Sequence, residues 1–194
     1  MHYIVGLGNK GEKYAFTRHN AGFMVLEVLR NDWGFEDWSF QKNISSFTSK
    51  GELNSDPVTL VMPDTFMNLS GRVIRKLKKE GMDVERFALV HDDLDLPLGT
   101  LKFVVGKGPG GHKGVSSVIE HLGTKNFLRL RFGIAPVSED GEPRKPQRAT
   151  DSFVLERFTE EEMKAVHQVA VRGREYLRTF VTEGVEKAIS SCKG

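Results

Sequence analysis

Short apolar runs without polar alternation, separated by stretches of helical periodicity, are the feature that most constrains this fold. Segments 3–7 and 87–90 carry no charged residue and do not alternate, which is typical of strands buried on both faces. Segments 21–29 and 115–122 repeat their apolar residues with helical spacing. The pattern predicts further strands at 47–50, 58–62, 101–105 and 127–134, and further helices at 70–81 and from Thr159 onward. This interleaving predicts an α/β fold, a three-layer sandwich in which a twisted mixed β-sheet lies between helices.

Length and composition fit one domain of ordinary globular type. The chain has 194 residues, of which 39% are hydrophobic and 28% charged, so we expect a single domain over 1–194 that needs no disulfide or metal. Its single cysteine, Cys192, has no partner in the chain, which indicates a reducing compartment. The first residues lack the pattern of a signal segment, and no apolar run approaches the roughly 18 residues of a membrane span. A cytoplasmic protein without a membrane partner is therefore expected.

Two glycine-rich segments are similar to nucleotide-binding motifs but lack features that those motifs require. Segment 6–11 fits the spacing G-x-G-x-x-G, but the polar residues 12–20 separate it from the next helix, which disfavours dinucleotide binding. Segment 106–114 holds five glycines and two lysines, yet it lacks the Gly-Lys-Ser/Thr sequence of a P-loop. Its backbone N–H groups and lysines favour contact with an RNA phosphate or a terminal ribose, and a plain flexible connection is the alternative.

Histidine is the side chain best suited to act as a base near neutral pH, and six are present. His19, His91 and His112 are expected in loops that follow predicted strands. The other three have no polar companions of note or lie in a helical segment, so we expect them to be structural. Position along the chain alone does not select a catalytic histidine.

Asp92 favours one of these candidates. It directly follows an apolar strand, and a carboxylate bonded to one imidazole nitrogen leaves the other nitrogen free to take a proton from water. We predict that Asp92 and His19, which come from different strand ends, form such a pair. A solvated acidic turn and a divalent-metal site at 91–95 are the alternatives, and the absence of a second acidic cluster disfavours metal.

Two asparagines and one basic segment are further candidates. Asn9 and Asn68 carry neutral amides, which suit the recognition of an uncharged peptide group. From the residues alone, a left-handed turn is the better explanation of Asn9 and the start of a helix that of Asn68, although Ser70 is the better cap. Segment 72–79 contains five lysines and arginines in a chain whose net charge is only +2. It predicts either an RNA-binding helix face or a plain solvated one.

Six short motifs together resemble those of bacterial-type peptidyl-tRNA hydrolase. They are segments 5–9, 17–22, 66–71, 91–97, 110–112 and 130–134, which read VGLGN, TRHNAG, FMNLSG, HDDLDLP, GGH and LRFGI. They recur in the order and spacing of that family and span nearly the whole chain. Each motif is weak by itself, but six in register are highly specific.

This resemblance implies a monomeric enzyme without metal or other cofactor, in which a twisted mixed sheet lies between helices. Its substrate is peptidyl-tRNA, whose peptide is esterified to the 3′-terminal ribose, and hydrolysis recycles tRNA from aborted translation. The resemblance implies that His19 is the general base and that Asp92 stabilises its active form. It assigns the substrate and tRNA contacts to Asn9, Tyr14, Phe66, Asn68, Lys107 and Arg131.

The chain departs from the family pattern at two positions. Lys113 replaces an asparagine that binds substrate in the family, and an ammonium donates hydrogen bonds but accepts none. We expect Lys113 to contact an RNA phosphate or a ribose oxygen. Lys10 stands where the family usually has proline, which should loosen the loop that bears Asn9. A fold relative that binds RNA without hydrolysis is therefore the alternative function, and the polar segment 138–148 is expected to be a mobile loop.

Overall fold

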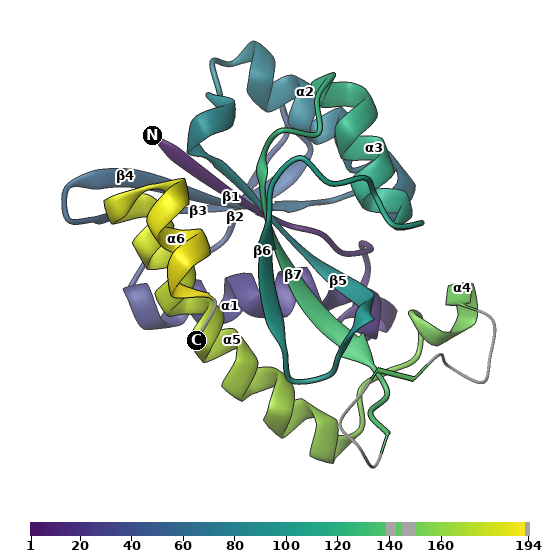
Figure 1. Cartoon of the computed structure of the whole chain (residues 1–194). Helices are drawn as coiled ribbons and strands as arrows, with labels where there is room; N and C mark the ends of the chain where they lie inside the picture. The colour runs from purple at the N-terminus through teal and green to yellow at the C-terminus, as the bar shows by residue number, and fades with distance from the viewer. Residues whose placement is uncertain (139–142, 145–149, 193–194) are drawn as a thin grey trace.

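A computed structural model of the chain describes residues 1–138, 143–144 and 150–192. Its centre is a seven-stranded sheet with the order β2-β3-β4-β1-β5-β7-β6 (Figure 1). The strands are β1 (His2–Gly6), β2 (Ser39–Gln41), β3 (Ser46–Leu53), β4 (Asp56–Pro63), β5 (Phe87–Pro97), β6 (Leu101–Val104) and β7 (Leu128–Ala135). The four central strands are parallel, whereas β2, β3 and β6 pair antiparallel at the two edges. The predicted mixed sheet is confirmed.

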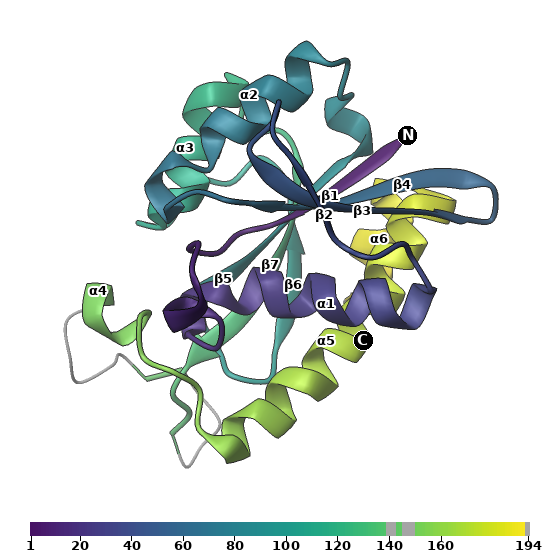
Figure 2. The ribbon, with the colours of Figure 1, turned by 180° about the vertical axis from the view of Figure 1, so that it is seen from behind.

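Helices cover both faces of this sheet, as Figures 1 and 2 show from opposite sides. One face carries α2 (Gly71–Lys79) and α3 (Lys113–Leu122), and the other carries α1 (Ala21–Trp33), α5 (Glu160–Glu183) and α6 (Val185–Ser191). Each layer has its own core. In β1, Ile4 belongs to the core under α1 and α5, whereas the next residue, Val5, belongs to the core under α2 and α3. Because successive strand residues point to opposite faces, a strand covered on both faces shows no polar alternation.

The predicted element boundaries differ from the structure at the strand that carries Asp92. The sequence predicts that the strand ends at Val90 and that His91 and Asp92 lie in the loop after it. Instead, β5 continues to Pro97, because residues 88–93 pair in parallel register with β7, where Asp92 lies opposite Phe132. The acidic segment is therefore held by a backbone ladder. His91 and Asp92 are strand residues rather than loop residues, and both are buried.

Smaller differences affect the remaining elements. The short edge strand β2 and the short helix α4 (Thr150–Phe153) were not predicted. The expected cap Ser70 stands at the N-cap position of α2, but its hydroxyl donates to the Met67 carbonyl at 2.9 Å and caps nothing. Most of the expected loop 138–148 lies outside the described residues. In the part of the chain that the structure describes, no helix is long and apolar enough to cross a membrane.

Candidate active site

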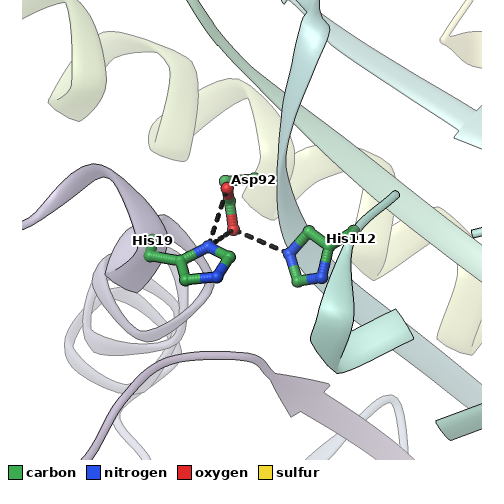
Figure 3. Close-up of side chains that lie close together, drawn as sticks. All are labelled: His19, Asp92 and His112. Atoms are coloured by element: carbon green, nitrogen blue, oxygen red, sulfur yellow. Dashed lines mark hydrogen bonds and ion pairs between the residues drawn. The ribbon is translucent and has the colours of Figure 1, made fainter. Parts of the chain in front are cut away.

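Three side chains from distant parts of the chain meet above the parallel strands (Figure 3). His19 comes from a 3-10 turn, Arg18–Asn20, that runs into α1; Asp92 comes from β5; and His112 directly precedes α3. His19 Nδ1 lies 2.9 and 3.0 Å from the two carboxylate oxygens of Asp92. His112 Nε2 lies 2.9 Å from Oδ1 of the same carboxylate. The structure thus brings the predicted pair together and adds a second histidine to it.

The turn that bears His19 is fixed by its backbone. The His19 N–H donates to the Val154 carbonyl at 2.8 Å. Immediately after the turn, Gly22 packs against the end of β1 and the middle of β5 so closely that a Cβ there would lie 2.5 Å from Leu7 N and 2.6 Å from the Val90 oxygen. Only glycine allows this approach of helix to sheet. The local sequence therefore places the imidazole directly beside the carboxyl end of β1 and the middle of β5.

Backbone hydrogen bonds define the tautomer of His112. Its Nδ1 accepts from the backbone N–H groups of Gly114 and Val115 at 3.1 and 3.2 Å. Nδ1 therefore carries the lone pair, and the proton of the neutral ring sits on Nε2 and points at Asp92. His19 in turn donates its Nδ1 proton to Asp92, so its Nε2 keeps a free lone pair. The two histidines are donors to one carboxylate, and His19 is the one left with a basic nitrogen.

The electrostatics of the cluster follow from burial and from this shared carboxylate. Burial opposes ionisation of Asp92, but the charges and hydrogen bonds of His19 and His112 outweigh it and lower the pKa of Asp92 far below its usual range. Burial also opposes protonation of His19, yet the carboxylate of Asp92 outweighs it and raises the pKa of His19. His91, buried beneath the cluster, behaves in the opposite way. Its burial, reinforced by His112, lowers its pKa to about 3, so it stays neutral.

The cluster also has the composition of a metal site. One potential ligand atom each from His19, Asp92 and His112 lies within 4.8 Å of the others. A metal bound here needs the lone pair of His112 Nε2, but that nitrogen holds the ring proton because Nδ1 accepts from two backbone N–H groups. The hydrogen bonds therefore fit a proton-transfer site better than a metal site.

Asn9 lies beside this cluster in a network that defines its amide. Its Oδ1 accepts from the Met67 N–H at 2.8 Å, and its backbone N–H and carbonyl bond to the side chain of Asn20 at 2.9 and 3.0 Å. The amide oxygen is therefore used within the protein, and the NH₂ group of Asn9 keeps its two donors. The left-handed alternative is excluded, because Asn9 is not among the described residues with positive φ.

Three other predicted contact residues, Asn68, Phe66 and Tyr14, lie on short turns outside the cluster. Asn68 and Phe66 are exposed on and beside a 3-10 turn, Met67–Leu69, and the Lys10 ammonium lies 5.7 Å from the Phe66 ring centre. Tyr14 is half-buried in the loop that precedes His19. Phe66 and Asn68 flank Met67, whose backbone N–H is bound by Asn9. The motif at 66–71 and the motif at 5–9 therefore form one surface.

Two hollows adjoin the cluster. The first, of about 270 Å³, is lined by His19, Asp92, His112, Lys113 and Asp151, among others. The second, of about 210 Å³, is lined by bases from β6, β7 and the glycine-rich loop, including Lys102, Lys107, Arg129 and Arg131. Both predicted bases, Lys107 and Arg131, are in the second hollow, and Lys113 is in the first.

Within the second hollow the two arginines of β7 have different environments. Arg131 pairs with Asp93. Arg129 is buried, and its guanidinium donates to the carbonyls of Lys107 and Gly108 at 2.7 and 3.1 Å. Arg129 therefore holds the glycine-rich loop in place. The sequence did not predict this role, because alternation along a strand does not show which loop packs against it.

Comparison with known proteins identifies the family of the chain. The model of the family described as peptidyl-tRNA hydrolase matches residues 3–194. The chain belongs to the peptidyl-tRNA hydrolase family. It is 36% identical over 193 residues to peptidyl-tRNA hydrolase of Thermodesulfovibrio yellowstonii, covering 98% of this chain and 97% of that protein. It is 40% identical over 189 residues to the enzyme of Citrifermentans bemidjiense, covering 96% and 95%.

Solved structures of the family have the same fold. The crystal structure of peptidyl-tRNA hydrolase from Acinetobacter baumannii superposes with a TM-score of 0.88 at 30% identity. The match covers 100% of this chain and 95% of that one. The family resemblance expected from the six motifs is confirmed.

The contact of His112 with Asp92 was not predicted from the sequence. His112 was only one of three candidate histidines. The available signal was its position between two glycines and a helix, which is where a side chain caps a helix. That signal predicts the bonds of Nδ1 to the backbone but not the contact of Nε2 with a strand residue.

Proposed function

We propose that this chain hydrolyses the ester that joins a peptide, or an N-blocked aminoacyl group, to the 3′-terminal ribose of tRNA. The observation that carries the proposal is the orientation of His19. Its Nδ1 donates to a buried carboxylate, and its Nε2 lone pair remains available beside an open cleft. A water held at Nε2 loses a proton to it and attacks the ester carbonyl, and the tRNA 3′-hydroxyl leaves. General-base assistance of this kind contributes about 10²–10⁴ in rate.

The charge distribution supports this chemistry. Proton transfer makes His19 an imidazolium, and the Asp92 carboxylate at 2.9 Å stabilises that charge. The ring of His112 donates to the same carboxylate and orients it without competing for the proton. The chemistry uses no metal or other cofactor, because every step moves a proton between water, His19 and the leaving oxygen.

The surrounding residues are assigned to substrate binding. The free NH₂ group of Asn9 suits a peptide carbonyl, and Asn68 holds the peptide backbone near the ester. Tyr14 and Phe66 contact the 3′ end, and Lys107 and Arg131 contact RNA phosphates. Helix α2, which carries five lysines and arginines at 72–79, binds the phosphates of the acceptor stem. This predicts that tRNA binding depends strongly on salt and shows little sequence preference. We further propose that the chain acts as a monomeric single domain in the cytoplasm.

The test is cleavage of N-acetylaminoacyl-tRNA. We expect turnover by the wild type, and we expect His19→Ala to lower kcat by about 10²–10⁴ while the Kd for tRNA stays within a few fold. His167→Ala is the matched control, since His167 is exposed on α5, away from the cluster. Absence of turnover with tight tRNA binding would favour the alternative, an RNA-binding relative without hydrolase activity. A His19→Ala variant with the wild-type rate would exclude His19 as the base.

A further inference from the structure

An ion pair lies on one side of the catalytic cleft. It joins two residues to which the proposed hydrolysis gives no role. The ammonium of Lys113, the first residue of α3, lies 2.7 Å from Oδ2 of Asp151 in α4. Both residues line the cleft that contains His19. The two side chains are 59% and 75% exposed, so the pair faces the entrance rather than the core.

The segment that carries Asp151 is also attached to the catalytic turn. The N–H of His19 donates to the Val154 carbonyl at 2.8 Å, and the N–H of Arg18 donates to the Glu156 carbonyl at 3.0 Å. The contacts form a ring around the cleft that passes through His19, Asp92, His112, Lys113, Asp151 and Val154. The Lys113–Asp151 pair is its most exposed link, since the groups bonded by Asp92 are nearly buried. The position of the Lys113 ammonium therefore depends on its ion pair with Asp151.

The charges of the cleft show what the ammonium contributes. Four of the lining residues that the structure describes carry carboxylates, namely Asp92, Asp93, Asp95 and Asp151. Among its described lining residues, Lys113 is the only one with a permanent positive charge. The reacting end of the substrate brings phosphates, and attack on an ester builds negative charge on the carbonyl oxygen. Carboxylates repel both, so an anionic oxygen in this cleft has Lys113 as its cationic partner.

We propose that Lys113 binds an anionic oxygen at the reacting end of the substrate and that Asp151 is the positioning residue for its ammonium. The proposal rests on the function proposed above. An ammonium has three donors, of which one is used by Asp151 and two remain for substrate. Asp151 also restrains a flexible four-carbon stem, which lowers the entropy lost when substrate binds. The oxygen belongs either to the tetrahedral intermediate or to a phosphate of the terminal nucleotides.

Steady-state cleavage of N-acetylaminoacyl-tRNA tests the proposal. We expect Lys113→Met to lower kcat/KM by about ten- to hundredfold, as for a lost hydrogen bond to a charged group. Asp151→Asn should lower it by about two- to fivefold, as for an exposed ion pair, and Asp151→Glu should restore it. A loss in kcat assigns the oxygen to the intermediate, and a rise in KM assigns it to a phosphate. Asp37→Asn removes an exposed partner of Arg30 elsewhere and is the control.

Exchanging the charges of Lys113 and Asp151 distinguishes substrate binding by the ammonium from a purely structural role of the ion pair, which would only hold α4 in place. Lys113→Asp combined with Asp151→Lys keeps an ion pair across the cleft but moves the ammonium to the other side. We expect the swap to leave the activity at the level of Lys113→Met. Full activity in the swap would overturn the proposal, because a structural link alone would then suffice. A Lys113→Met variant within about twofold of the wild type would overturn it as well.

The pH profile adds a readout that a structural role would not move. The charged and titratable groups that face His19 are Asp92 from β5, His112 and Lys113 at the start of α3, and Asp151 from α4. Lys113 lowers the pKa of His19, and Asp151 raises it. The acidic limb of kcat/KM should therefore move up in Lys113→Met and down in Asp151→Asn. Identical profiles in the two variants would contradict the placement of the pair beside the base.

The same assays distinguish failure of this proposal from failure of the proposed function. If the wild type turns over substrate and His19→Ala does not, the function stands, and the Lys113 variants decide the proposal alone. If the wild type shows no turnover, both are overturned.

Discussion

Replacement of Asp92 by asparagine tests the proposed arrangement most directly, because two histidines donate hydrogen bonds to that side chain and an amide has only one acceptor oxygen. Both imidazoles donate to Asp92, at 2.9 Å from Oδ1 in each case, with His19 also 3.0 Å from Oδ2. An amide offers one acceptor oxygen and one NH₂ donor in place of two acceptors. His112 cannot change its tautomer cheaply, because its Nδ1 accepts from two backbone N–H groups. The amide oxygen therefore stays at the Oδ1 position to accept from His112.

His19 is therefore the residue that loses a hydrogen-bond acceptor. The NH₂ group of the introduced amide then takes the place of Oδ2, 3.0 Å from His19 Nδ1, so the Nδ1 proton faces a donor there and keeps only the amide oxygen at 2.9 Å, which it shares with His112. His19 relieves this by moving its proton to Nε2, and the nitrogen that should accept a proton from water loses its lone pair. We expect Asp92→Asn to lower kcat by about 10²–10⁴, the whole contribution of general-base assistance.

The assay is single-turnover cleavage of N-acetylaminoacyl-tRNA across pH, with thermal unfolding to confirm that the variant is folded. The Kd for tRNA should stay within a few fold, because Asp92 is buried beneath the cleft. His112→Asn is the companion variant. It removes the competing donor, so the introduced amide of Asp92→Asn can turn its oxygen toward His19 in the double variant, and part of the activity should return. A folded Asp92→Asn variant with kcat within about tenfold of the wild type would refute the tautomer argument.

Two further predictions concern buried polar groups near the site. The folded-state pKa of His91 is about 3, below the unfolded value of about 6.5. Below about pH 6.5 the unfolded chain therefore binds a proton at His91 that the native state does not bind. The free energy of unfolding falls as pH falls through 6.5. Between pH 7 and 5 this loss should be about 2 kcal/mol, and urea unfolding should find it reduced in His91→Gln. Asn9→Ala leaves the Met67 N–H without its acceptor and should cost about 1–3 kcal/mol of stability. Asn9→Asp keeps that acceptor but loses the NH₂ donors, so it should stay more stable while KM rises; equal KM in Asn9→Asp and the wild type would exclude the amide from substrate binding.

Local pattern was sufficient to predict six of the seven strands that the structure describes. A strand buried on both faces shows no polar alternation, and the segment at 3–7 has this property because α1 and α2 cover β1 from opposite sides. The pairing of His19 with Asp92 was also predictable, since both follow predicted strands and the carboxyl ends of parallel strands meet at one edge of a sheet. The extent of β5 was not predictable in this way. Its residues 91–93 are polar, and they are strand only because β7 supplies the partner.

The sequence by itself determined the fold class, the family and the candidacy of His19 and Asp92. Only the tertiary structure decided that His112 shares the carboxylate of Asp92, that the oxygen of Asn9 faces inward, and that Lys113 pairs with Asp151. The physical reason is the range of the interactions. Periodicity reports what lies within a few residues, whereas each of these contacts joins residues 20 to 58 positions apart. Tautomers, amide orientation and the direction of an ammonium follow from which donors and acceptors meet across that distance, and packing of the sheet and its helices is what brings them together.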